Sequence, residues 1–235
     1  MLRQIPQSKI RTITMFDWNT IKTVMLDMDG TLLDLHYDNY FWLEYLPQHY
    51  AVARDMDEVT AREQLRHRFQ SERGKLHWYC IDYWSEQLGI DVLSLKHDIT
   101  DRIGYLPQAR QLLDHCRQSP VETLIVTNAH RKILALKESV IPLSTQVDRV
   151  WSSHDFGHPK EDLAFWHALS NAQRFDPSST LFVDDNDSVL DAAARYGIAH
   201  LARPLRPDSK RAAQTVNTQA NYRDIESLAD LLQGI

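Results

Sequence analysis

Cysteine is scarce in this sequence. Its 235 residues include only Cys80 and Cys116, which form no C-x-x-C pair and lie among no closely spaced histidines. Such sparse thiols exclude a disulfide scaffold, disfavour a thiolate zinc site and fit a reducing cytoplasm. The 11 histidines form no H-x-H or H-E-x-x-H pattern. Because His154 and His158 lie in a loop containing Gly and Pro, we expect both to be solvated.

Long apolar runs and an excess of basic charge are also missing. No stretch approaches the roughly 18 apolar residues of a membrane span, and residues 1–16 lack the continuous apolar core of a signal peptide. The 26 Lys and Arg residues against 32 Asp and Glu give a formal charge of -6, which disfavours non-specific nucleic-acid binding. We predict a soluble cytoplasmic protein without a membrane or nucleic-acid partner. The sequence does not indicate an oligomeric state.

The size and the hydrophobic pattern predict one α/β domain with an insertion. Short apolar runs that end in turn signals indicate buried strands over 22–27, 122–127, 148–152, 180–184 and 198–202. Segments with helical spacing separate them at 107–116, 131–139, 160–172 and 188–196, and a terminal helix is expected over 224–232. This alternation predicts a Rossmann-like, doubly wound parallel sheet formed by residues 1–34 and 105–235.

Residues 35–104 interrupt this alternation. They contain no strand-like run, and helical character is found over 38–46, 57–71, 76–88 and 91–103. About 70 residues are too many for a plain connection, so we predict an inserted helical cap domain. Hinges near Asp34 and Gly104 would let this cap close on a substrate.

Acidic, hydroxyl and basic side chains follow the predicted strands. The first strand ends in Asp27-Met28-Asp29-Gly30-Thr31, the second in Thr127-Asn128 and the fourth in Asp184-Asp185, and Lys160 opens a helix soon after the third. In open parallel sheets, ligands bind beyond the carboxyl ends of the strands, so these groups are expected to meet in one pocket. Two carboxylate pairs, a hydroxyl and an ammonium suit phosphoryl transfer.

The first acidic pair predicts two different catalytic roles, a nucleophile and a proton donor or acceptor. Asp27 and Asp29 are two residues apart, so on extended chain their side chains leave on the same face, and one can attack while the other handles the proton. Gly30 lets the backbone turn tightly beside a bound phosphate. Lys160 is expected to hold phosphate as a compact cation, with hydrogen bonds from Thr127 and the neighbouring backbone at Asn128.

The acidic groups also predict a metal ion. Asp27, Asp184 and Asp185 would repel one another and raise each other's pKa values if they were not coordinated. A hard divalent cation relieves this repulsion, and Mg2+ prefers carboxylate oxygens together with water and substrate phosphate. Magnesium is therefore the predicted cofactor.

The four motifs together resemble those of the haloacid dehalogenase superfamily of phosphohydrolases. They stand here as D-M-D-G-T, T-N, a lysine and D-D, in that order, and the insertion after the first strand resembles the helical cap of one branch. Within that branch, five stretches are similar to bacterial 5'-nucleotidases that act on GMP and IMP. These stretches cover 26–35 with 38–42, 78–89, 127–130, 156–162 and 190–198.

The resemblance implies a mechanism. Asp27 would be the nucleophile that forms an aspartyl-phosphate, and Asp29 the general acid and base. The Asp27 carboxylate, the Asp29 carbonyl and the acidic pair would hold Mg2+, with Asp185 the direct ligand and Asp184 supporting it. Two departures stand out: Glu161 follows the lysine where many relatives have proline, and no acid lies four residues after Asp185.

Aromatic residues dominate the predicted cap, and stacking on a purine base would select a nucleoside monophosphate as the small-molecule substrate. A stripe of aromatic residues at helical spacing is nevertheless more often core packing. The candidates are Phe41, Trp42, Trp78, Tyr79, Tyr83 and Trp84. Trp78 is our candidate for the base, and Asp82 could accept the guanine N1 and N2 hydrogens or be an exposed helix carboxylate. Asp34 and Asn39 either line the entrance or cap a helix.

Other readings of the same motifs stay open. A sugar-phosphate phosphatase of looser specificity or a phosphomutase would use the same aspartates, and the cap would decide between them by excluding water. Dehalogenation is disfavoured, because it has no leaving alkoxide for Asp29 to protonate. A nucleotide-binding regulatory module on an inactive phosphatase fold is the non-enzymatic alternative.

Overall fold

The protein is built on a six-stranded parallel sheet. A computed structural model describes residues 15–233. The strand order is β3-β2-β1-β4-β5-β6, and every neighbouring pair is parallel. The strands are β1 (Thr23–Leu26), β2 (Glu122–Thr127), β3 (Arg149–Ser152), β4 (Thr180–Val183), β5 (His200–Pro204) and β6 (Arg223–Ile225). The predicted α/β class with a parallel, doubly wound sheet is confirmed.

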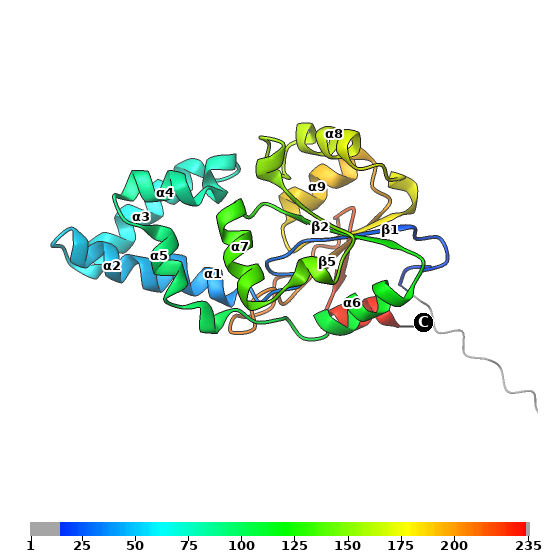
Figure 1. The fold of residues 1–235 in the computed structure, drawn as a ribbon, viewed down its shortest axis with the longest axis horizontal. Coiled ribbons are helices and arrows are strands. Elements are labelled where there is room, and N and C mark those ends of the chain that lie inside the picture. The colour runs from blue at the N-terminus through cyan, green and yellow to red at the C-terminus, as the bar shows by residue number, and fades with distance from the viewer. Residues whose placement is uncertain (1–14, 234–235) are drawn as a thin grey trace, which may run out of the picture.

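Helices cover both faces of the sheet, which makes three layers (Figure 1). α6 (Ala109–Gln118) and α7 (Arg131–Val140) lie on one face, and α8 (Leu163–Ala172) and α9 (Asp187–Tyr196) on the other. Because side chains alternate along a strand, β1 supplies both layers: Val24 and Leu26 join one apolar cluster and Met25 the other. This burial on both faces explains why the strand sequences are apolar throughout.

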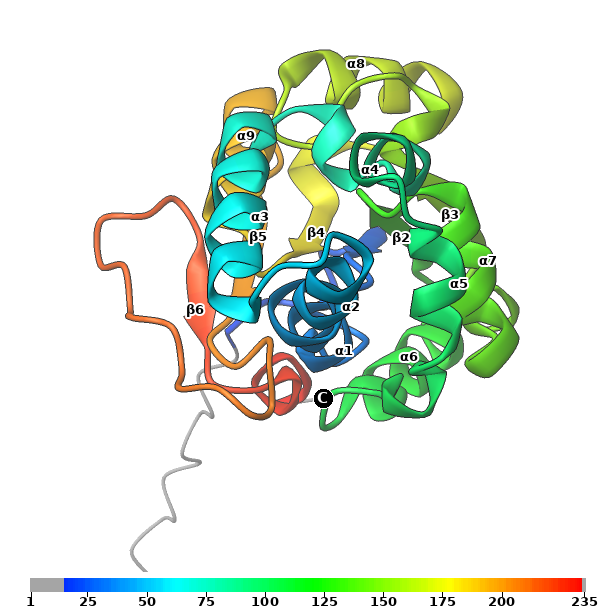
Figure 2. The same cartoon turned by 90° about the vertical axis from the view of Figure 1, so that its left-hand side faces the viewer.

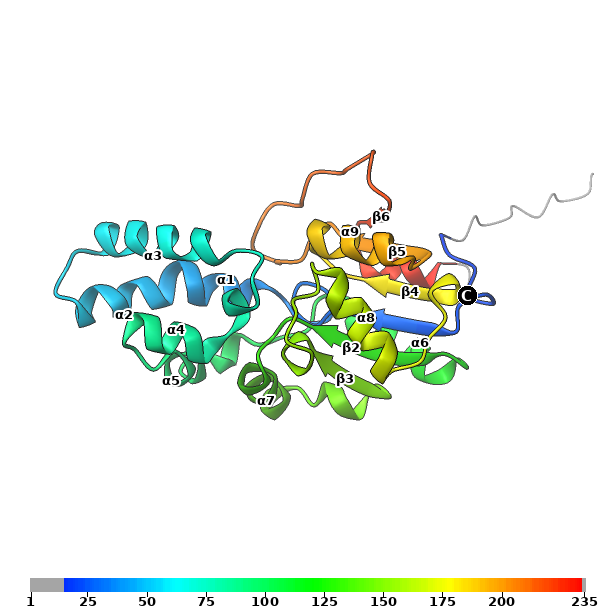
Figure 3. The same cartoon turned by 90° about the horizontal axis from the view of Figure 1, so that it is seen from above.

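A second group of helices lies beside the sheet rather than on its faces (Figure 3). It comprises α1 (His36–Tyr40), α2 (Leu46–Ala53), α3 (Glu58–Glu72), α4 (Ile81–Leu88) and α5 (Val92–His97), with a π-helical turn at Phe41–Tyr45 and 3-10 turns at Leu76–Tyr79 and Thr100–Arg102. Viewed from this side, the helices stand in front of the strand ends (Figure 2). Division into domains at residues 34 and 105 stays a prediction.

The predicted terminal helix over 224–232 is wrong. Arg223–Ile225 forms strand β6, which pairs with β5, and a 3-10 helix follows at Leu228–Leu232. Three residues carry too little periodicity to indicate a strand, and this one is held by tertiary contacts. Ile225 is buried, and Asp224 accepts a hydrogen bond from the Arg203 guanidinium at 2.7 Å.

The strand order sets the position of the site. After β1 the chain adds β2 and β3 on one side of β1, and it then crosses back to add β4, β5 and β6 on the other side. The strand order therefore reverses between β1 and β4, and in such sheets a crevice opens there beyond the carboxyl ends of the strands. Those ends point toward the group of helices α1 to α5 (Figure 3). Within residues 15–233, no helix combines the length and the apolar character needed to cross a bilayer.

Candidate active site

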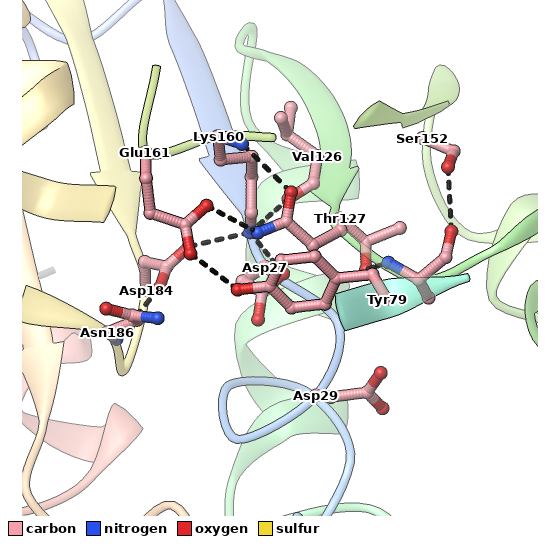
Figure 4. Close-up of polar contacts among 12 residues, drawn as sticks. Asp27, Asp29, Tyr79, Val126, Thr127, Ser152, Lys160, Glu161, Asp184 and Asn186 are labelled. Carbon is pink, nitrogen blue, oxygen red and sulfur yellow. Dashed lines mark hydrogen bonds and ion pairs between the residues drawn. The ribbon is translucent and has the colours of Figure 1, made fainter. Parts of the chain in front are cut away.

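Lys160 stands at the centre of the carboxyl edge of the sheet. Its Nζ donates to Asp27 Oδ1 at 2.5 Å, to Asp184 Oδ2 at 2.7 Å and to the carbonyl of Val126 at 2.9 Å (Figure 4). All three of its donor hydrogens are therefore used, and Lys160 is only 2% exposed. The two carboxylates hold the pKa of Lys160 above its usual value despite its burial, so it carries a full positive charge. The sequence placed Lys160 at the start of a helix, but it lies in the turn before α8.

The turn after β1 brings its backbone against the last acidic pair. Gly30 has φ of 81°, and its amide donates to the Leu33 carbonyl at 2.8 Å, which closes the turn. A Cβ built at Gly30 would lie 2.6 Å from Cγ of Asp185, closer than real Cβ atoms approach. Only glycine fits both the left-handed conformation and the space. Asp185 is thereby packed against the turn that carries Asp27.

Three carboxylates form the group that best fits a cation. Oxygen atoms of Asp27, Asp184 and Asp185 all lie within 4.8 Å of one another. Burial raises the pKa of Asp27 to about 7, against the attraction of Lys160, and burial and the charge of Asp184 raise the pKa of Asp185 well above its usual value. One lysine thus leaves the trio with excess negative charge, which suits a hard divalent cation with oxygen ligands.

Asp29 belongs to a second network, which is built on two buried lysines. Lys137 Nζ on α7 donates to Asp29 Oδ1 and to Asp38 Oδ2, each at 2.5 Å, and Lys96 Nζ on α5 donates to Asp38 Oδ1 at 2.6 Å. Burial raises the pKa of Asp29 to about 6, opposed by the charge of Lys137. Figure 4 shows the Asp29 side chain set apart from the Lys160 cluster. The two aspartates of the first motif therefore have different surroundings.

The second motif positions its neighbours. The Thr127 hydroxyl accepts the Ala129 amide at 3.0 Å and keeps its own hydrogen free to donate. Asn128 Oδ1 accepts the amide of Lys160 at 2.9 Å, and its Nδ2 donates to Glu161 Oε2 at 3.0 Å. Asn128 therefore fixes the loop that carries the lysine.

A cavity of about 360 Å³ opens above these groups. Its floor is polar and includes Asp27, Asp29, Thr127, Asn128, Lys160, Asp184 and Asp185, and its wall is aromatic, with Trp42, Phe69, Trp78, Tyr79 and Trp84. The rings of the wall pack edge to face on one another, for example Phe69 on Trp84 at 4.9 Å. One pocket thus joins charged groups to an apolar aromatic wall.

Two candidate substrate residues lie elsewhere. Asp82 is not in the cavity wall; its carboxylate is 52% exposed and accepts from Lys132 Nζ at 2.7 Å. Asp34 Oδ1 accepts backbone amides of His36 and Ser209, both at 3.0 Å, so it fastens the start of α1 to a distant loop. Roles for Asp82 and Asp34 in substrate binding stay predictions.

Sequence reasoning missed the buried lysines Lys96 and Lys137. The signal for Lys137 is its place on the apolar face of α7, three or four residues after Ile133 and Leu134, where a lysine needs a buried partner. Glu161 was noted only as a departure from proline. It accepts from Tyr79 Oη at 2.5 Å and so joins the lysine loop to the helical group.

The expectation that His154 is solvated is wrong. Its Nε2 is buried and has no hydrogen-bond partner among residues 15–233. His158 keeps a side chain that is 46% exposed, with Asp162 3.7 Å from its Nδ1, as expected for a solvated loop. A loop containing Gly and Pro does not tell which of its side chains turns inward, because that depends on the loops it meets.

The fold and the site define an α/β enzyme with a buried, lysine-bridged carboxylate centre. Residues 24–202 match the model of the haloacid dehalogenase-like hydrolase family, and the chain belongs to this family. It is a hydrolase, as the motifs indicated. The chain is 36% identical over 211 residues to the GMP/IMP nucleotidase YrfG of Escherichia coli (strain K12), covering 90% of this chain and 95% of that protein. The Shigella flexneri protein of the same name gives the same values.

Solved structures share the fold. An HAD phosphatase from Thermococcus onnurineus superposes with a TM-score of 0.75 at 20% identity, covering 90% of this chain and 96% of that one. An L-2-haloacid dehalogenase from Xanthobacter autotrophicus gives 0.63 at 18% identity over 92% and 99% of the two chains. A putative beta-phosphoglucomutase from Thermotoga maritima gives 0.64 at 15% identity over 90% and 97%. These likenesses extend across several activities, so they establish the fold alone.

Proposed function

We propose that this hydrolase is a Mg2+-dependent 5'-nucleotidase that releases phosphate from purine nucleoside monophosphates, with GMP and IMP as substrates. The observation that carries the proposal is the single cavity in which Asp27, bound by Lys160, lies below an aromatic wall. The relative at 36% identity, named as a GMP/IMP nucleotidase, supports the choice of substrate.

In the proposed first step, Asp27 attacks the phosphorus atom and the bond to the 5' oxygen breaks. The Asp29 carboxyl gives its proton to that oxygen, so that the nucleoside leaves as a neutral alcohol. A pKa raised by burial to about 6 leaves part of Asp29 protonated near neutral pH, which suits this task. The Lys160 ammonium and the Thr127 hydroxyl stabilise the charge on the phosphoryl oxygens.

In the proposed second step, Asp29 takes a proton from water, and the oxygen of that water attacks the phosphorus of the aspartyl-phosphate. The bond from phosphorus to the Asp27 oxygen breaks, which releases inorganic phosphate and restores the Asp27 carboxylate. Asp29 is protonated again at the end of this step. Its bond to Lys137 fixes the carboxyl group through both halves of the reaction.

Mg2+ is the cation that we propose for the carboxylate trio. Asp27, Asp184 and Asp185 would hold it with the backbone carbonyl of Asp29, and the close packing of Gly30 on Asp185 keeps one ligand in place. When bound, the cation neutralises charge on the phosphoryl oxygens. Relief of the excess negative charge among these three aspartates, two of them buried, supports its presence.

Base selection is assigned to the aromatic wall, and residues 35–104 are proposed to act as a cap. A flat purine is expected to stack there while the phosphate reaches the polar floor. A sugar-phosphate phosphatase would leave this wall unused, and a phosphomutase would have to exclude water from the pocket. A nucleotide-binding module would not need an Asp29 whose pKa is raised to about 6.

We also propose that the reaction takes place in the cytoplasm.

Trp78→Ala tests the proposed role of the wall. We expect kcat/KM for GMP to fall by about 5- to 150-fold, the equivalent of 1 to 3 kcal/mol of stacking, while hydrolysis of p-nitrophenyl phosphate stays nearly unchanged. Steady-state assays with both substrates measure the split. Tyr83→Ala, an aromatic of α4 that does not line the cavity, is the matched control. Equal losses for both substrates in Trp78→Ala would remove the stacking argument.

Lys137→Met tests the link between Asp29 and α7. Lys137 lowers the pKa of Asp29, so its removal raises that pKa further above its unfolded value. Because the second step needs the Asp29 carboxylate, the acid limb of the pH profile of kcat should move to higher pH. Lys22→Met, an exposed lysine before β1, should leave the limb in place. A Lys137→Met enzyme with a lower kcat but an unmoved acid limb would show that Lys137 does not act through the pKa of Asp29.

A further inference from the structure

Three loops bring one thiol and two imidazoles together at the junction of the two groups of helices. Cys80 precedes α4, His130 follows β2, and His154 follows β3 in a 3-10 turn at Ser153–Asp155. One ligand atom from each of these residues lies within 4.8 Å of the others. The rings of His130 and His154 meet edge to face, with centroids 4.8 Å apart. This group, which we call the thiol-imidazole cluster, shares no residue with the carboxylate trio, although His130 lines the same cavity.

The cluster has side-chain atoms that are available to bind a metal ion. Nε2 of His154 is buried and has no hydrogen-bond partner among residues 15–233, which is costly for a polar atom unless something binds it. Burial and the neighbouring His130 lower the pKa of His154 to about 4, so the ring is neutral and offers a lone pair at pH 7. Among the described residues, the Cys80 Sγ accepts only the Tyr83 amide, at 3.5 Å, a contact that a thiolate keeps.

A fourth donor stands at the edge of the cluster. Asp82 Oδ2 is 3.9 Å from Nε2 of His130, and Asp82 is two residues after Cys80 on the same helical turn. Its contact with Lys132 is at the surface and is easily exchanged. One sulfur, two nitrogens and one oxygen make a ligand set typical of Zn2+ rather than Mg2+.

We propose that Cys80, His130 and His154 form a second metal site, which takes Zn2+ with Asp82 as its fourth ligand. Donor atoms of a tetrahedral zinc site lie roughly 3.3 to 3.8 Å apart, and the ligand atoms of the cluster lie within 4.8 Å of one another, so binding requires a contraction of no more than about 1.5 Å. Binding releases the thiol proton to solvent. If the metal takes Nε2 of His130, the ring proton must lie on Nδ1. Nδ1 then no longer accepts the Lys132 amide, a contact of 3.4 Å.

The site would join the helical group to the sheet. Cys80 and Asp82 belong to α4 and its N-terminus, whereas His130 and His154 belong to loops at the carboxyl edge. Tyr79, next to Cys80, already donates to Glu161 on the sheet side. Zinc would fix this segment over the cavity and slow the release of products. This consequence rests on the proposed function, but the binding of the metal does not.

Titration of the untagged full chain with Co2+, in excess Mg2+ to occupy the carboxylate trio, tests the site. We expect a thiolate-to-cobalt charge-transfer band in the near ultraviolet that Zn2+ displaces with one equivalent. Cys80→Ser should abolish the band, and His154→Ala should weaken binding by about 100-fold or more, beyond the loss caused by removing an outer-sphere partner. His158→Ala, outside the cluster, should bind as the wild type does.

Retention of the band and the affinity in Cys80→Ser would overturn the proposal, as would equal losses in His158→Ala. Circular dichroism checks that each variant is folded. If Cys80→Ser does not fold, the result for His154→Ala still decides the test. In a separate assay of GMP hydrolysis, Zn2+ should inhibit the wild type but not Cys80→Ser. Binding without inhibition would keep the site and remove only its regulatory effect, whereas a lack of any GMP hydrolysis would count against the proposed function alone.

Discussion

Asp27→Asn is expected to lose phosphate release from GMP by roughly 10⁴-fold or more, because it removes the only attacking group that the proposed mechanism has. The amide is nearly isosteric with the carboxyl group, and Lys160 keeps its bonds to Asp184 and the Val126 carbonyl. The fold and the aromatic wall should therefore be preserved. Rapid-quench assays give the rate, and calorimetry with GMP gives the affinity.

The outcome separates three accounts of the chain. Loss of turnover with retained GMP binding supports covalent catalysis by Asp27. Wild-type turnover in Asp27→Asn would mean that Asp27 is not the nucleophile, and no turnover in either protein would favour a binding module. Asp114→Asn on α6, whose carboxylate is exposed, is the matched control and should be fully active.

Lys160→Met should damage both stability and activity. The substitution keeps most of the volume but leaves Asp27 and Asp184 buried without their shared cation, a loss of about 3 to 5 kcal/mol in the free energy of unfolding. Without Lys160, the pKa of Asp27 rises further above its unfolded value, so the variant's deficit grows as pH increases from 5 to 8. Denaturant titrations at several pH values measure this.

Magnesium provides an internal check on that prediction. A cation in the carboxylate trio replaces part of the lost positive charge, so Mg2+ should restore more stability to Lys160→Met than it adds to the wild type. Lys22→Met, at the other end of β1, should lose less than about 1 kcal/mol at every pH. A deficit in Lys160→Met that is independent of pH would mean that packing, and not charge, dominates at this position.

Much of the fold could be predicted because the sheet is buried on both faces. Strands such as β1 and β4 are short apolar runs that end in acidic residues, and both were located within two residues. β6 could not be found, because its three residues owe their conformation to pairing with β5 and to the Arg203 contact. Helix starts were located less accurately than strands. The predicted helix begins at Lys160, whereas α8 begins at Leu163, directly after its N-cap residue Asp162.

The site could likewise be predicted only in part. Residues at strand ends could be placed together because parallel strands present their carboxyl ends at one edge, which brings Asp27, Lys160 and Asp184 within bonding distance. The network of Asp29, Lys137 and Lys96 depends on how α7 and α5 pack, and although its spacing marks Lys137 as buried, no spacing in the sequence indicates its partners. The thiol-imidazole cluster is hidden for the same reason, because each member comes from a different loop.

The central claim is that this hydrolase removes phosphate from purine nucleoside monophosphates with Mg2+. Phosphate release from a panel of nucleoside 5'-monophosphates and sugar phosphates, with Mg2+ or with EDTA, tests it most directly. We expect the highest kcat/KM for GMP and IMP, and release that stops in EDTA and returns with Mg2+. Release from sugar phosphates alone, or undiminished release in EDTA, would contradict the account.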